Sequence, residues 1–158
     1  MQFMSSWSTR DRRTLVHFTE PALNQFIRFI QKSASDLEAG GILLGTVHGS
    51  NLIVTEVTIP TTSDKRSHYS FERMPVGHDA VAHERWASSE GIIRYLGEWH
   101  THPENYPRPS QLDEQEWIRL ASLRQDNRPM LAVIVGRNDL HVELMCSPKS
   151  NFILFGVE

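Results

Sequence analysis

The sequence is poor in cysteine and in long apolar runs, and each shortage excludes a class of protein. Its 158 residues include a single cysteine, Cys146, so no disulfide can form within the chain, which fits a reducing cytosol. No apolar run approaches the ~20 residues that span a bilayer. Residues 1–13 lack the basic and then apolar order of a secretory signal. We therefore expect a cytoplasmic protein without a membrane partner.

The chain also lacks a strong charge of either sign. Its formal net charge is -3, so no overall basic field attracts nucleic acid. Arg10, Arg12 and Arg13 form a small cluster near the N-terminus, which we interpret as the solvated entry to the first strand rather than as a binding patch. Apolar residues make up 39% and charged residues 22% of the chain, as in globular proteins with a core. We expect no nucleic acid among its partners.

Alternating apolar residues, helical spacing and turn residues divide the chain into segments. Strands are predicted at residues 13–18, 41–48, 52–59, 92–100, 130–136, 139–145 and 151–157. Helices are predicted from Thr19 to near Ser35, over 77–89 and from Ser110 onward. This order predicts an α/β (α+β) fold, in which one mixed β-sheet is flanked by helices. We expect residues 1–12 to be a flexible segment and residues 13–158 to form a single domain.

A polar stretch with prolines near both ends, residues 60–76, is predicted to be a long loop. Loops of this length inside a domain are usually functional or mobile. Two interpretations stay open for it, contact with a substrate and a solvated connector that leads into the helix at 77–89.

The strongest chemical signal lies in residues 98–113. His100 and His102 stand two apart on a predicted strand, and side chains at that spacing project from the same face. Two neutral imidazoles can hold zinc together with a third protein ligand, and an open fourth position then allows catalysis. Asp113 is the natural third ligand, because a short proline-rich loop can fold the first turn of the next helix back over the end of the strand.

Each half of this pattern also has an ordinary explanation. Ser110 and Asp113 match the N-terminal cap of a helix, and two histidines on a strand are often only half exposed. Capping and metal binding are compatible, since an acidic group is favoured in the first helical turn. The combination of His-x-His-Pro, six residues and Ser-x-x-Asp is far more specific than either half.

These residues resemble the JAMM (JAB1/MPN/Mov34) metalloprotease motif, His-x-His-Pro-x6-Ser-x-x-Asp. The family motif also has an upstream glutamate, in a segment similar to Glu-x-x-Gly-x-Leu-x-Gly. Residues 38–45 of this chain read EAGGILLG, so Glu38 takes the place of that glutamate. The resemblance covers roughly residues 13–145 and implies the MPN/JAMM fold.

The resemblance implies a zinc hydrolase that cuts the amide bond after the C-terminal glycine of a ubiquitin-like protein. His100, His102 and Asp113 would hold one Zn2+, and water would complete the tetrahedron. Glu38 would take a proton from that water and pass it to the leaving amine. Ser110 would donate a hydrogen bond to the oxyanion on the attacked carbonyl.

Residues around the motif are expected to have supporting or structural roles. Glu98 should share the face of His100, so it is either an acceptor behind a histidine or an ordinary polar residue. Glu104 is expected to be a solvated loop residue, Trp99 to lie in the core, and Trp117 to pack beneath the site. The remaining histidines and the lone cysteine are expected to be structural or on the surface: His17, His48, His68, His78, His83, His141 and Cys146.

The segment 97–104, GEWHTHPE, looks closest to bacterial JAMM deubiquitinase-like peptidases of CBASS antiphage operons. Those operons also encode a cGAS-like nucleotidyltransferase and an E1–E2-like enzyme. This branch implies release of the C-terminal tail of the cGAS-like enzyme from its targets, in opposition to the E1–E2-like ligase. Three alternatives stay open: a peptidase for another bacterial ubiquitin-like or sulfur-carrier protein, a zinc-containing MPN scaffold without hydrolysis, and a nucleic-acid-associated relative, which the net charge disfavours.

Overall fold

A computed structural model describes residues 3–147 and 150–158. The strands of its larger sheet are β1 (Ser6–Ser8), β2 (Leu15–Phe18), β3 (Gly40–His48), β4 (Asn51–Val57), β7 (Arg94–Thr101), β8 (Met130–Val135), β9 (Leu140–Ser147), β10 (Ser150–Ile153) and β11 (Phe155–Val157). A small hairpin is formed by β5 (Lys65–Arg66) and β6 (Phe71–Glu72), and the helices are α1 (Glu20–Arg28), α2 (His78–Ser88) and α3 (Gln111–Ser122). In those described ranges, every helix falls short of a membrane span in length or in apolar character.

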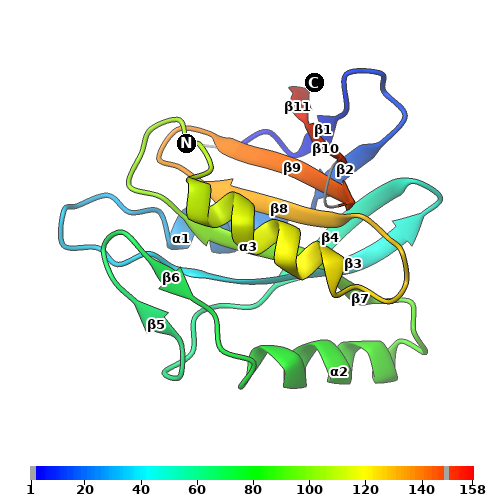
Figure 1. Cartoon of the computed structure of the whole chain (residues 1–158), viewed down its shortest axis with the longest axis horizontal. Helices are drawn as coiled ribbons and strands as arrows, with labels where there is room; N and C mark the ends of the chain where they lie inside the picture. Colours follow the sequence, from blue (N-terminus) through cyan, green and yellow to red (C-terminus); the bar gives the residue numbers. More distant parts are fainter. Residues whose placement is uncertain (1–2, 148–149) are drawn as a thin grey trace.

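The strands of the larger sheet follow the order β10-β9-β8-β7-β3-β4-β2-β1-β11 (Figure 1). At its centre, β3 pairs antiparallel with both β4 and β7, and β7 runs parallel to β8. The β3–β4 and β8–β9 hairpins agree with the sequence prediction, and Gly49 provides the positive φ of 62° at the first turn. The mixed sheet with flanking helices confirms the predicted fold class.

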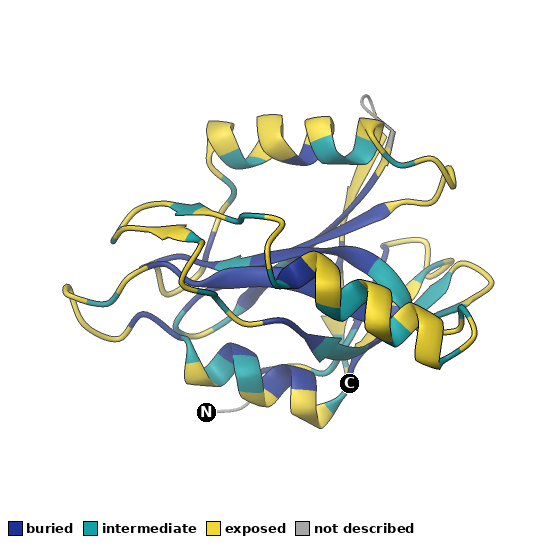
Figure 2. Ribbon diagram, turned by 90° about the horizontal axis from the view of Figure 1, so that it is seen from below, coloured by how far each residue is buried: buried dark blue, intermediate teal, exposed yellow. Residues whose placement is uncertain are grey.

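Helices cover both faces of the sheet centre, so β8 is buried along its whole length. One face packs on α1 and the other on α3, and Figure 2 shows the buried strands between these two helices, whose outer sides are exposed. The side chains of β8 alternate between the two faces: Leu131, Val133 and Val135 lie in the core on the α1 side, and Met130, Ala132 and Ile134 lie against α3.

The two ends of the chain differ from their predictions. Residues 6–8, predicted to be flexible, form β1 between β2 and β11, because Phe3 and Trp7 bury their side chains in the core. The predicted last strand, 151–157, divides at the buried Leu154 into β10, which pairs with β9, and β11, which pairs with β1. The two edge strands of the sheet, β10 and β11, are therefore separated in sequence only by Leu154.

The first helix is shorter than its periodicity predicts, because it ends at Arg28 rather than near Ser35. Beyond it, side chains bind the backbone groups that a helix would use. The carbonyl of Gln31 accepts from Arg137 Nε at 2.8 Å, and the Asp36 carboxylate accepts from two backbone N–H groups of residues 32–33. Such local side-chain bonds compete with helix continuation.

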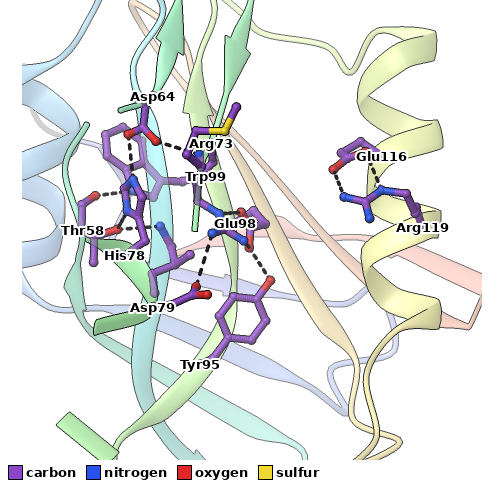
Figure 3. A network of polar contacts seen from close by, with 12 residues as sticks. Thr58, Asp64, Arg73, His78, Asp79, Tyr95, Glu98, Trp99, Glu116 and Arg119 are labelled. Atoms are coloured by element: carbon purple, nitrogen blue, oxygen red, sulfur yellow. Dashed lines mark hydrogen bonds and ion pairs between the residues drawn. The ribbon is translucent and has the colours of Figure 1, made fainter. Parts of the chain in front are cut away.

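The predicted long loop 60–76 contains the β5–β6 hairpin and is anchored by a buried aspartate. The Asp64 carboxylate accepts from His78 Nε2 at 2.7 Å and from the backbone N–H of Met74 at 2.8 Å. Across the same imidazole, His78 Nδ1 is 2.6 Å from the hydroxyl of Thr58 (Figure 3). The segment is therefore fixed to the end of β4 and the start of α2.

Candidate active site

The end of β7 carries the two histidines of the motif. His100 pairs with Gly40 of β3 and with Ile134 of β8, and His102 follows directly after the strand. The two Nε2 atoms are 3.1 Å apart. Both rings therefore point toward one place, as the two-residue spacing predicts.

Asp113 reaches the same place from the first turn of α3. Ser110 Oγ accepts from the N–H of Asp113 at 3.1 Å, and Asp113 Oδ2 accepts from the N–H of Ser110 at 2.8 Å, which completes a capping box. The same carboxylate places Oδ1 3.2 Å from His100 Nε2 and Oδ2 3.1 Å from His102 Nε2. One side chain thus caps the helix and faces both histidines.

These three side chains fit a zinc ion. Tetrahedral zinc with bonds of about 2.0–2.1 Å places neighbouring nitrogen and oxygen ligands about 3.3 Å apart. The two Nε2 atoms are 3.1 Å apart, and each lies 3.1–3.2 Å from a different oxygen of Asp113. With one ligand atom from each residue, all three atoms lie within 4.8 Å of one another, so the groups converge closely enough to share a metal. Two imidazoles and one carboxylate also form a common donor set of catalytic zinc sites, with a fourth position for water.

Glu38 lies just before β3 and is directed at this cluster. Its Oε1 atom is 3.9 Å from His102 Nε2, and its side chain is only 5% exposed. Burial raises the pKa of Glu38 to about 7, against the opposing effect of His102, and the charge of Asp113 adds to the rise. A carboxyl group with a pKa near neutrality can both accept and release a proton.

The β5–β6 hairpin fixes the backbone on both sides of this glutamate. The N–H of Glu38 donates to the carbonyl of Ser67 at 2.7 Å, and its carbonyl accepts from Arg66 Nε at 2.7 Å. Gly40 allows the close approach, because a Cβ there would lie 2.6 Å from the ring of Phe71 in β6. The glycine at position 40 is thus explained by its close packing against the hairpin.

Glu104 is an exposed loop residue, as predicted, but it also contacts a motif histidine. Its half-exposed carboxylate accepts from His102 Nδ1 at 2.7 Å, which leaves Nε2 with a lone pair for a metal. Burial lowers the pKa of His102, but the bonds to Asp113 and Glu104 outweigh it and raise the pKa above its usual value. Burial likewise opposes ionisation of Asp113, yet the bonds to His100 and His102 hold its pKa well below the usual range.

Glu98 does not support a histidine, which was one of its two interpretations. Its buried carboxylate accepts from Arg73 Nε at 2.6 Å and from the hydroxyl of Tyr95 (Figure 3). Burial raises the pKa of Glu98 against the effect of Arg73. Because Arg73 belongs to 60–76 and also lies 3.6 Å from Asp79, this cluster is a second anchor for that segment.

The two tryptophans near the motif are structural, as predicted. Trp99 lies in the core, where its ring is 5.2 Å from that of Phe26. Trp117 is buried beneath the site, with its ring 6.3 Å from that of His100 and stacked on His141 at 6.2 Å. The ring of Trp117 therefore packs behind His100.

Comparison with known proteins identifies the family. A model described as prokaryotic homologs of the JAB domain matches residues 19–146. The chain belongs to this family. The JAMM resemblance carried by the histidine and glutamate motifs is thereby confirmed.

Two relatives carry the name CD-NTase/cGAS isopeptidase. One, from Pseudomonas aeruginosa, is 58% identical over 158 residues and covers both chains completely. The other, from Escherichia coli, is 36% identical over 112 residues, which are 71% of this chain and 70% of that protein. A solution structure of a Desulfitobacterium hafniense protein shares the fold of this JAB-domain chain, with a TM-score of 0.63 at 20% identity, over 87% of this chain and 88% of that one.

Proposed function

We propose that the chain is a zinc-dependent isopeptidase that releases a cGAS-like nucleotidyltransferase (CD-NTase) from proteins to which its C-terminus is joined. One observation carries the proposal: the metal-binding atoms of His100, His102 and Asp113 converge beside the buried Glu38. The names of the two relatives support this substrate. An E1–E2-like ligase is the proposed counterpart, and the cytoplasm, where Cys146 stays reduced, is the proposed compartment.

His100, His102 and Asp113 are the proposed ligands of a single Zn2+. When bound, the metal lowers the pKa of a coordinated water toward ~7 and polarises the carbonyl that is attacked. Glu104 keeps the His102 ring in the tautomer whose Nε2 carries a lone pair. Trp117 supports the ring of His100 from below.

Glu38 is the proposed general base and, later, the general acid. Its carboxylate accepts a proton from the attacking water, whose oxygen forms a bond to the amide carbon. It then gives that proton to the amide nitrogen as the carbon–nitrogen bond breaks, so the free amine leaves and the carboxylate is restored. In the metal-free chain, burial raises the pKa of Glu38 to about 7, and a carboxyl group that holds a proton this readily can both accept and release one.

Ser110 is the proposed donor to the oxyanion. Its Oγ already accepts from the N–H of Asp113, so its own hydrogen is free to be donated elsewhere. The side chain is exposed at the start of α3, beside the aspartate of the cluster. This hydroxyl would donate a hydrogen bond to the oxygen of the attacked carbonyl as negative charge develops on it.

The experiment uses the chain and its Glu38→Gln variant, each loaded with zinc. The substrate is a cGAS-like nucleotidyltransferase fused through its C-terminus to a reporter protein, and a fusion without the last residues of that tail is the control. Both proteins are expected to bind about one zinc by plasma mass spectrometry. Only the wild type should cut at the junction, because loss of a general base costs about 10²–10⁴-fold in rate.

Each outcome decides between the candidate functions. Cleavage of the fusion by the wild type alone supports the metal site, the base and the substrate together. Zinc binding without cleavage of this fusion, but with cleavage of a ubiquitin-like or sulfur-carrier fusion, would replace the substrate and keep the chemistry. Equal zinc binding with no cleavage of any fusion would contradict the hydrolase and favour a scaffold.

A further inference from the structure

Thr101 stands between the two metal-facing histidines and is completely buried. Its hydroxyl accepts from the backbone N–H of Ala39 at 2.9 Å and donates to Gln31 Oε1 at 2.8 Å. The backbone N–H of Thr101 in turn donates to the carbonyl of Ala39 at 2.8 Å. Ala39 follows Glu38 directly, so this reciprocal pair joins the segment of the base to the segment of the metal ligands.

These bonds act where the regular strand pairing has ended. The last ladder pair between β3 and β7 is Gly40 with His100, and Glu38 lies two residues beyond it. The Thr101 hydroxyl therefore extends the pairing by one residue, up to the neighbour of Glu38. A side chain here does what a backbone carbonyl does elsewhere in the sheet.

Gln31 closes the network from a distant part of the sequence. It is completely buried, and its side-chain nitrogen donates to the carbonyls of Asp36 at 3.3 Å and His68 at 3.0 Å. Its side-chain oxygen is the acceptor for Thr101, so both ends of the amide are satisfied in one orientation. Gln31 thus connects the approach to Glu38 and the turn of the β5–β6 hairpin to the histidine strand.

We propose that Thr101, supported by Gln31, is a positioning residue that holds Glu38 in register with His100 and His102. The proposal rests on the proposed function, in which Glu38 handles the proton of the attacking water. Glu38 has no contact of its own with Thr101, so the hydroxyl acts through Ala39. Displacement of a reacting group by about 1 Å can cost 10²-fold in rate, so the rate should depend strongly on how this segment is held.

The test compares Thr101→Val with Thr101→Ser. Valine keeps the shape and removes the hydroxyl, whereas serine keeps the hydroxyl. Thr9→Val is the matched remote control, because the buried Thr9 hydroxyl likewise accepts a backbone N–H, from Thr14, and donates to a side chain, that of Asp11. All three variants are measured with zinc on the nucleotidyltransferase fusion.

T101V is expected to lower kcat about 10- to 100-fold with KM and zinc stoichiometry unchanged. T101S should stay within about threefold of the wild type, and so should T9V. A second readout needs neither metal nor substrate: in the zinc-free proteins, amide hydrogen exchange at Ala39 should quicken in T101V and remain slow in T101S and T9V.

Equal losses of kcat in T101V and T9V, or no rescue in T101S, would overturn the proposal, since the hydroxyl would then matter only for stability. If T101V does not fold, Gln31→Met removes the acceptor of the hydroxyl instead, and should lower kcat and quicken exchange at Ala39 in the same way. If the wild type cuts no fusion, the proposed function fails, while exchange at Ala39 still reports whether Thr101 holds this segment.

Discussion

Two buried histidines, His78 and His102, each face an aspartate, yet only His102 belongs to the proposed metal site. His78 is completely buried, and both of its ring nitrogens have a protein partner: Nδ1 lies 2.6 Å from the Thr58 hydroxyl, and Nε2 donates to the Asp64 carboxylate at 2.7 Å. The Nδ1 atom of His102 is hydrogen-bonded to Glu104, while its Nε2 faces His100 Nε2 and an oxygen of Asp113.

The difference lies in what the second nitrogen faces. The hydroxyl of Thr58, which also accepts from the N–H of Ile42, and the carboxylate of Asp64 engage both ring nitrogens of His78, so neither nitrogen is left to face a ligand. At His102, the atoms within reach of Nε2 are a second imidazole and a carboxylate. The acceptor atoms that converge at His102 are stabilised by a cation. The hydrogen-bonded chain through His78 already satisfies its own groups and needs no cation.

The largest expected effect comes from removing the aspartate of the reactive cluster. Asp113→Ala should abolish zinc binding at micromolar metal and all cleavage, because two imidazoles alone hold zinc weakly. The bond from the N–H of Ser110 to the carboxylate is lost as well, while the Ser110 side-chain cap remains, so the free energy of unfolding should fall by at most about 1 kcal/mol. Calorimetric zinc titration and urea unfolding measure the two effects, and retention of tight zinc binding would contradict the ligand assignment.

The matched change beside His78 should lower the stability of the fold and leave zinc binding unchanged. Asp64→Ala removes the acceptor of three partly buried donors, the backbone N–H groups of Thr61 and Met74 and the ring of His78. The free energy of unfolding should therefore fall by about 3 kcal/mol. Zinc stoichiometry should remain one per chain. Loss of zinc with unchanged stability would show that the two histidine–aspartate pairs had been assigned the wrong way round.

The smallest expected effect concerns the acceptor behind His102. Glu104→Gln keeps a hydrogen bond to Nδ1 but removes the charge that stabilises it. Because such outer partners tune ligand basicity, zinc affinity should fall about tenfold, measured by competition with a chelator. Glu98→Gln is the control, since that carboxylate is bonded to Arg73 and Tyr95 and not to a histidine. An equal fall in both variants would contradict the role of Glu104.

The sequence predicted the parts of this site that depend on short spacing. His100 and His102 follow from strand periodicity, and the Ser110–Asp113 cap follows from helix chemistry, so their meeting could be inferred from a short loop. The upstream Glu38 could be found only through the family resemblance, because no local rule connects residue 38 to residue 100.

The contacts that the sequence did not predict involve side chains whose direction is set by irregular backbone or by long-range packing. Glu104 follows Pro103, where strand alternation has ended, so no period indicates that it turns back to His102. Gln31 and Thr101 are 70 residues apart, and a buried glutamine in a helical pattern resembles an ordinary surface position. Such contacts are fixed only by the packing of three separate segments.

The division of the C-terminal segment at Leu154 has a consequence for synthesis of the chain. Until residues 150–157 leave the ribosome, the outer edge of β9 and the free edge of β1 both expose unpaired backbone groups. Exposed edges of this kind pair readily with other chains. A nascent chain that has not yet released residues 150–157 is therefore vulnerable to aggregation at both edges of its sheet, and the same few residues close both edges at once.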